Sequence, residues 1–312
     1  MRVIFFGTPT FAVPTLEGLW QSRHAVVGVV TQPDRPRGRG QHVQPSAVKA
    51  AALAHDLAVW QPGTLKDEAF LAMIRSAAPD LGVVAAYGKL LPDVLLAIPR
   101  LGLINVHASL LPRYRGASPI QRAVLAGDAE TGVSIMRVVA ALDAGAVLAQ
   151  RRHPIGPDDT SGDVERALAT LGASLLCEMV DRLAAGPVQE VPQQDAHATY
   201  APRLRKEEGL VDWSHAASTL HNHVRAMQPW PGASTFLDGE RLVIRRTRVD
   251  LPTTAPPGTI IEADHDVLRV ATGDNSSLRV LELQPSGRRA MTVRDFLAGR
   301  RLAAGARFTG PS

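Results

Sequence analysis

The stretch Asn105-Val106-His107-Ala108-Ser109-Leu110-Leu111-Pro112-Arg113-Tyr114-Arg115-Gly116 joins a buried strand to an abrupt turn. The apolar run 101–106 predicts the strand, and the Ser, Pro, Arg and Gly residues that follow end it. Asn105 and His107 are two residues apart, so on a strand their side chains point to the same side. In an open parallel sheet, ligands bind where strands end at their carboxyl edge. An amide and an imidazole there suit chemistry on a carbonyl, because the amide holds an oxyanion and the imidazole moves a proton.

The first half of the chain alternates strand-like and helix-like segments around this stretch. This pattern predicts an α/β fold with a doubly wound, mostly parallel, Rossmann-like sheet. Two further runs, 131–139 and 146–152, are expected to add strands at an edge of that sheet. A long helix is predicted over 163–185, with Thr160 or Ser161 as its N-cap. The remaining strands are expected at 3–6, 25–31 and 81–86, and the remaining helices at 45–55, 92–98 and 119–126.

The second half of the chain has a different pattern. Residues 189–206 contain prolines and polar residues without a clear period, which predicts a linker between an N-terminal domain, 1–188, and a C-terminal domain, 207–312. After a predicted helix over 214–227, short alternating runs divided by Gly, Asp, Asn and Pro favour a small OB-like β-barrel. A last helix is expected over 292–298, with Thr292 as its cap.

Composition limits the class of protein. With 312 residues, 45% of them hydrophobic, the chain is long enough for one large or two ordinary globular domains. The net charge of +4 permits an anionic partner without requiring one. Cys177 is the single cysteine and lies in an apolar run, which excludes an internal disulfide and favours a core position. No apolar run is long enough to span a bilayer, so we expect a cytoplasmic protein without a membrane partner. A single cysteine also excludes a multi-cysteine metal site, and we expect no metal.

Nucleotide-binding enzymes are disfavoured by the turn after the first strand. That turn reads Gly7-Thr8-Pro9-Thr10-Phe11-Ala12 and lacks the second and third glycines of the dinucleotide fingerprint. The chain also contains no P-loop motif.

Several segments resemble the folate-dependent formyltransferases. Residues 109–116 resemble the signature segment of that family, and Leu142-Asp143-Ala144-Gly145 resembles its Asp-bearing loop. Residues 31–40 are similar to a basic loop of the branch that acts on methionyl-tRNA. Further matches follow in family order over nearly the whole chain, at 7–9, 127–132, 159–162, 206–208, 212–213 and 229–231.

The resemblance implies a catalytic set of Asn105, His107 and Asp143. An Asp close to His107 could hold it in one protonation state or bind a water that carries protons, and the residues leave both roles open. The resemblance also implies 10-formyltetrahydrofolate as the formyl donor, with the apolar runs 83–87 and 138–142 as walls for its pteridine. Ala141 stands where the family pattern suggests glycine. The family's folate-binding segment maps to Ser109, Leu110, Leu111 and Pro112.

The implied acceptor is the α-amino group of methionine on initiator methionyl-tRNA. Arg35, Arg37 and Arg39 lie among prolines and glycines with one acid, Asp34, in a loop that cannot pack into a core. The resemblance makes this loop a contact for the tRNA acceptor stem, with Arg39 the foremost residue, and makes the C-terminal barrel, 207–312, a tRNA-binding domain. We expect a monomer.

Close alternatives share the expected fold. A formyltransferase acting on a small-molecule amine, such as an amino sugar nucleotide or glycinamide ribonucleotide, would use much the same Asn, His and Asp, as would a formyltetrahydrofolate hydrolase. The basic insertion at 32–46 and the C-terminal domain argue against the ribonucleotide enzyme and the hydrolase. A non-enzymatic RNA-binding module is an alternative of a different class, which the small barrel alone would suggest.

Overall fold

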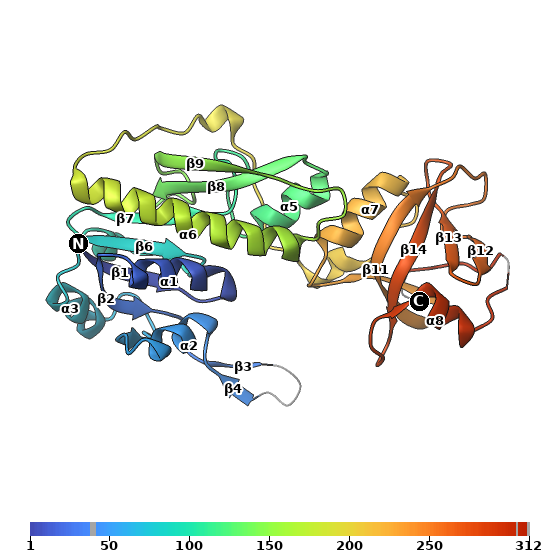
Figure 1. The fold of residues 1–312 in the computed structure, drawn as a ribbon, viewed down its shortest axis with the longest axis horizontal. Coiled ribbons are helices and arrows are strands. Elements are labelled where there is room, and N and C mark those ends of the chain that lie inside the picture. Colours follow the sequence, from blue (N-terminus) through green and yellow to red (C-terminus); the bar gives the residue numbers. More distant parts are fainter. Residues whose placement is uncertain (38–41, 304, 311–312) are drawn as a thin grey trace. The chain divides into compact units, whose positions relative to one another are not determined.

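The computed structural model describes residues 1–37, 42–303 and 305–310 (Figure 1). The chain divides into two compact units. The first comprises 1–119, 130–154 and 165–202, and the second comprises 120–129, 155–164 and 203–312. Two short pieces of the predicted N-terminal domain, 120–129 and 155–164, therefore group with the second unit. The division into 1–188, a linker over 189–206 and 207–312 stays a prediction. Among the described residues, no helix combines the length and the apolar character needed to cross a membrane.

The first unit is built on a seven-stranded sheet of order β5-β2-β1-β6-β7-β8-β9. β1 pairs in parallel with β2 on one side and with β6 on the other, so the strand order reverses there. The last two strands are antiparallel to their neighbours. The prediction of a doubly wound, mostly parallel sheet with two added edge strands is confirmed. The strands are β1 (Arg2–Gly7), β2 (Ala25–Val30), β5 (Val59–Trp60), β6 (Leu81–Ala85), β7 (Leu103–His107), β8 (Glu130–Arg137) and β9 (Val147–Pro154).

The helices of the first unit are α1 (Val13–Gln21), α2 (Ala47–Ala54), α3 (Glu68–Ser76), α4 (Asp93–Leu96) and most of α6 (Ser161–Ala185). Asp67 caps the N-terminus of α3, because its side chain accepts a hydrogen bond from the Phe70 N–H. The helix buries Phe70, Leu71 and Ile74. Neither α1 nor α3 was expected from the pattern. α1 contains Pro14 and Gly18, which weaken a helical signal, and α3 is only nine residues long.

The two faces of the sheet have different covers. Ile4, Phe6 and Leu103 pack in one cluster with α3 and with Leu95 of α4. On the other face, Gly172 of α6 lies so close to Val106 of β7 that an added Cβ would come within 2.7 Å of it. Because side chains alternate along a strand, Asn105 and His107 share the face of Leu103, opposite α6.

Tyr87 places a polar group inside the cluster around α3. The residue is 2% exposed, and its hydroxyl has no hydrogen-bond partner among the described residues. Burial disfavours the charged phenolate and raises the pKa of Tyr87 to about 12. The hydroxyl therefore reduces stability, because an unsatisfied buried polar group retains its desolvation penalty.

Tyr87→Phe is expected to raise the free energy of unfolding by about 1 kcal/mol at neutral pH. The gain should grow as pH rises from 10 to about 12, because only the unfolded chain of the parent protein ionises Tyr87 in that window. Urea unfolding of both proteins at pH 7 and pH 11 measures this difference. An equally or less stable Phe variant would mean that the hydroxyl is satisfied.

The second unit contains an antiparallel sheet of order β10-β11-β14-β13-β12, with β15 paired to β14. Residues 307–309 bridge both edges, because Thr309 pairs with Phe236 of β10 and Arg307 pairs with Thr259 beside β12. The sheet therefore closes on itself, which agrees with the predicted barrel. Its strands are β10 (Ala233–Leu237), β11 (Glu240–Asp250), β12 (Ile260–Asp264), β13 (Val267–Ala271), β14 (Ser277–Pro285) and β15 (Met291–Thr292).

The helices of the second unit are α5 (Pro119–Ala126, of which 120–126 group here), α7 (Ala217–Ala226) and α8 (Val293–Ala298). Thr292 caps α8 as predicted, since its side chain accepts from the Asp295 N–H. At the start of α6, Thr160 is the cap of the two that were considered, because its hydroxyl accepts from the Asp163 N–H at 3.2 Å.

Candidate active site

The carboxyl end of β7 presents Asn105 and His107 on one face, as predicted. Asn105 is half-buried, and its side-chain amide forms no hydrogen bond with any described residue. The side chain of His107 is 6% exposed, and its Nε2 lies 3.0 Å from the carbonyl oxygen of Tyr114. Because a carbonyl can only accept, Nε2 carries the proton in that hydrogen bond. Nδ1 is left to face the other side of the site.

The loop after β7 is held by its own hydrogen bonds and by Ser134 of β8. The Ser134 hydroxyl donates to the Ser109 carbonyl at 2.6 Å and accepts from the Leu111 N–H at 3.0 Å. The Ser109 hydroxyl donates to the carbonyl of Arg113 at 2.6 Å, and Leu110 packs against Gly132 of β8. The hydroxyl and the carbonyl of Ser109 are therefore both hydrogen-bonded within the chain. These hydrogen bonds give the loop a fixed shape.

Asp143 reaches His107 by a route that the strand order makes indirect. β8 runs antiparallel to β7, so its end at Arg137 lies beside Ile104, at the start of β7. The loop between β8 and β9 must therefore double back along β7. Asp143 has φ +48°, in the left-handed region that Asp tolerates better than most residues. Ala141 has no such positive φ, so it fits where glycine was expected without backbone strain.

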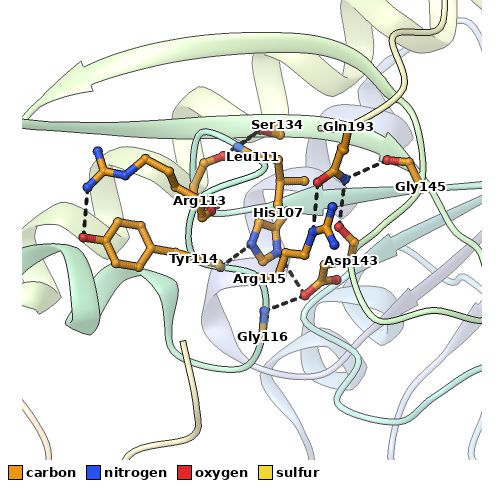
Figure 2. Close-up of polar contacts among 11 residues, drawn as sticks. His107, Leu111, Arg113, Tyr114, Arg115, Gly116, Ser134, Asp143, Gly145 and Gln193 are labelled. Carbon is orange, nitrogen blue, oxygen red and sulfur yellow. Dashed lines mark hydrogen bonds and ion pairs between the residues drawn. The ribbon is translucent and has the colours of Figure 1, made fainter. Parts of the chain in front are cut away.

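The structure brings His107 and Asp143 together (Figure 2). Asp143 Oδ2 lies 3.7 Å from His107 Nδ1 and accepts a hydrogen bond from the Gly116 N–H at 2.8 Å. The two ring nitrogens of His107 thus face a carbonyl and a carboxylate. A protonated imidazole can donate toward both, so His107 is well placed to carry a proton and pass it on. No group of three or more His, Cys, Asp or Glu side chains arranged to hold a metal ion occurs in the described ranges.

Two residues outside the predicted set complete the surroundings of Asp143. Gln193 Nε2 donates to the carbonyl oxygens of Asp143 at 2.8 Å and of Gly145 at 2.7 Å (Figure 2). Arg115, only 4% exposed, donates through Nε to Gln193 Oε1 at 3.0 Å. Arg115 lies in the segment that resembles the family signature, so that resemblance could have identified it. Gln193 lies in the segment interpreted as a linker, and no motif marks it.

The basic loop begins as a hairpin of β3 (Arg35–Arg37) and β4 (His42–Gln44), in which Arg35 pairs with Gln44. Arg35 is exposed and forms no ion pair with the described residues. Arg37 belongs to β3, and Arg39 lies outside the described residues.

The acid of this loop is already engaged. Lys49 Nζ lies 2.6 Å from Asp34 Oδ2, and Gln61 Nε2 donates to Oδ1 at 2.7 Å. The hydrogen bond from Lys49, followed by that from Gln61, lowers the pKa of Asp34 below its usual value. Asp34 is therefore occupied by Lys49, and the charge of Arg35 remains available to a partner.

Comparison with known proteins identifies close relatives. The family described as formyl transferase matches residues 1–180, and its C-terminal domain matches residues 203–301. The methionyl-tRNA formyltransferase of Methylococcus capsulatus is 48% identical over 97% of this chain and 98% of its own length. That of Roseiflexus castenholzii is 48% identical over 99% of both chains.

Solved structures share the fold at low identity. The structure of WlaRD, a sugar 3N-formyl transferase crystallised with dTDP and 5-N-formyl-THF, has a TM-score of 0.67 and 16% identity, covering 93% of this chain and 99% of its own. At that identity the likeness establishes the fold alone.

Proposed function

The chain belongs to the formyl transferase family, and from that premise we propose that it transfers the formyl group of 10-formyltetrahydrofolate to the α-amino group of methionine on initiator methionyl-tRNA, for translation initiation. The observation that carries this proposal is the 48% identity to a methionyl-tRNA formyltransferase over 97% of the chain. The identity to a sugar formyltransferase of the same fold is 16%.

Formyl transfer to an amine needs a donor to a developing oxyanion, an acceptor for the proton of the amine and a proton for the departing nitrogen. Asn105 supplies the first, since its amide has no competing partner among the described residues and stands two residues from His107 on the same face. His107 supplies a proton or a second hydrogen bond to the oxyanion, because its ring is fixed by the Tyr114 carbonyl.

Asp143 acts on the charge and the proton of the His107 imidazole. Its carboxylate is 3.7 Å from His107 Nδ1, so it stabilises a positive charge on the imidazole. The Gly116 N–H fixes one carboxylate oxygen, which keeps Asp143 pointed at His107 rather than at solvent. Both roles left open by the sequence, holding His107 in one protonation state and binding a water that carries protons, are compatible with this geometry.

The formyl donor brings the group that is transferred, and the chain's residues hold and orient it. We propose that Ser109, Leu110, Leu111 and Pro112 contribute the shape of the binding site. Their loop is held from beneath by Ser134 and by Gln150, whose Nε2 donates to the Leu111 carbonyl at 2.8 Å. A loop fixed in this way suits close contact with a flat ligand, because little conformational entropy is lost on binding.

The acceptor can be tested directly. The protein would be offered 10-formyltetrahydrofolate with charged initiator tRNA, charged elongator tRNA, free methionine or an amino sugar nucleotide. We expect initiator methionyl-tRNA to be formylated fastest. Preferential formylation of the amino sugar would favour the small-molecule alternative. RNA binding without turnover of the formyl donor would favour a binding module.

Arg39→Ala is expected to lower kcat/KM for methionyl-tRNA, because we propose that the basic loop contacts the tRNA. The KM for the formyl donor should change little. Arg35→Ala and Arg37→Ala should have smaller effects, as point charges beside phosphates. Loss of one phosphate contact should also reduce the slope of log activity against log salt by about 1.

Steady-state rates measured over a series of salt concentrations give both quantities. Lys66→Ala, which removes an exposed positive charge outside the short segments that resemble the family, is a control for net charge. An Arg39→Ala variant that uses methionyl-tRNA as well as the parent protein, with an unchanged salt slope, would remove the loop from the tRNA interface. We further propose that the protein acts as a monomer in the cytoplasm, where charged tRNA is available.

A further inference from the structure

Residues 191–201, here called the strap, connect the two loops that carry the site. At one end, Val191 and Val147 exchange backbone hydrogen bonds of 2.9 and 2.8 Å, just after the Asp143 loop. At the other end, the Arg115 N–H donates to the Thr199 carbonyl at 2.8 Å, and the Ala201 N–H donates to the Arg115 carbonyl at 2.7 Å. The strap therefore pairs with the chain beside Asp143 and with the loop that holds His107.

Gln193 links the same two loops through one side chain. Its amide nitrogen donates to the carbonyls of Asp143 and Gly145, and its amide oxygen accepts from Arg115. The Gln193 amide thus uses its two N–H donors and its oxygen acceptor, as a neutral glutamine can. Figure 2 shows these contacts, which join Gln193 to Arg115, Asp143 and Gly145.

Arg115 is anchored on its far side as well. Arg115 Nη2 lies 2.7 Å from Asp195 Oδ1, while the Arg115 side chain is only 5% exposed. The next residue, Gly116, is the one whose N–H binds the Asp143 carboxylate. A Cβ at Gly116 would meet the Ala201 carbonyl of the strap at 2.7 Å, so the strap lies directly against that position.

Little apolar packing holds the strap in place. Val191 is 52% exposed and Tyr200 is 68% exposed, and the residues between them are mostly exposed. The position of the strap therefore depends on its hydrogen bonds. The Asp143 loop has the same need, because it doubles back along β7 with a left-handed residue at its tip.

We propose that Gln193 is a positioning residue, which fixes the Asp143 carboxylate relative to His107 by tying the Asp143 loop to Arg115. Its role in turnover rests on the proposed function, whereas its role in ordering the loop does not. Gln193 does not touch the reacting atoms. It acts through the backbone of residues 143–145, so its loss affects the rate of the chemical step more than the binding of substrates.

The first test compares kcat and KM in three variants. Gln193→Ala removes all three hydrogen bonds. Gln193→Glu keeps an acceptor for Arg115 but faces two carbonyl oxygens with a carboxylate, so it removes the donors to the Asp143 loop. Gln194→Ala is the matched control, since Gln194 is the neighbouring glutamine and its side chain is exposed.

We expect kcat to fall by about 10- to 100-fold in both Gln193 variants, because a displacement near 1 Å at a catalytic group can cost about 100-fold. KM for the formyl donor should stay near that of the parent protein, and Gln194→Ala should match the parent in both constants. Rates are expressed per folded molecule, measured by circular dichroism at the assay temperature. If Gln193→Glu retains parental kcat, anchoring of Arg115 and not positioning of Asp143 is the role of Gln193, and the proposal is wrong.

The second test needs no substrate. Hydrogen–deuterium exchange should quicken in peptides covering 113–117 and 141–147 in both Gln193 variants, and not in Gln194→Ala. Unchanged exchange in 141–147 would overturn the proposal. If the parent protein formylates no methionyl-tRNA, the proposed function fails, and the exchange experiment still decides whether Gln193 orders the Asp143 loop.

Discussion

Replacing His107 with alanine is expected to lower kcat for formyl transfer by about 100- to 10,000-fold, the range for loss of a positioned proton-transfer group. His107 is buried, is fixed by the Tyr114 carbonyl and faces Asp143, so solvent water cannot readily take its place. KM for the formyl donor should change far less, because His107 acts on the charge that develops during the reaction.

Initial rates at saturating formyl donor and methionyl-tRNA measure this effect. His265→Ala is a suitable control, because its side chain is 88% exposed and lies in the second unit. A His107→Ala variant with kcat within a few-fold of the parent protein would remove His107 from the chemistry, whatever its place in the fold.

Asp143→Asn is expected to lower kcat by about 100-fold or more while leaving the protein folded. The asparagine keeps an oxygen that can accept from the Gly116 N–H, and Asn tolerates the positive φ found at this position. What it removes is the negative charge 3.7 Å from His107 Nδ1. The substitution therefore separates the electrostatic role of Asp143 from its role in shaping the loop.

The matched control is Asp56→Asn, which changes an exposed aspartate of similar φ, +53°. Thermal unfolding of the parent protein, Asp143→Asn, Asp143→Ala and Asp56→Asn shows whether the substitutions preserve the fold. If Asp143→Asn turns over at the parental rate while Asp143→Ala does not, the charge is dispensable and only the hydrogen bond to Gly116 matters.

Much of the first unit could be predicted because local pattern and tertiary structure agree there. The apolar run before His107 forms β7, as its pattern predicts. The alternation of side chains along a strand also predicts that Asn105 and His107 share one face. The helix at 119–126 has the predicted bounds. α1 and α3 are not expected from the sequence because their short apolar periods are interrupted or brief, and helices of this length depend on tertiary packing for most of their stability.

The approach of Asp143 to His107 could not be predicted from residues alone. The rule that parallel strands end at one edge applies to β7 but not to the antiparallel β8, so the Asp143 loop begins near the other end of β7. Its return depends on Gln193, which is far along the chain in a segment without periodicity. A run of polar residues without a period looks like a linker in the sequence. The same run can be solvated or can form hydrogen bonds to a distant loop, and the pattern does not distinguish the two cases.

Closure of the barrel is a similar case. The alternating runs predicted strands, but the pairing of residues 307–309 with both edge strands depends on contacts between parts of the chain that no local pattern encodes. Arg35 is exposed on the described hairpin of the basic loop, and the roles of both Arg35 and Arg39 toward tRNA stay predictions for the variant assays above.

The most direct measurement follows the formyl group itself. The protein would be mixed with donor labelled in the formyl carbon and with initiator methionyl-tRNA, and the tRNA ester would then be hydrolysed to release the amino acid. The account predicts labelled N-formylmethionine as the product of the parent protein, formed at least about 100-fold more slowly with His107→Ala. Label recovered as free formate, or on a small-molecule amine in preference to methionine, would contradict it.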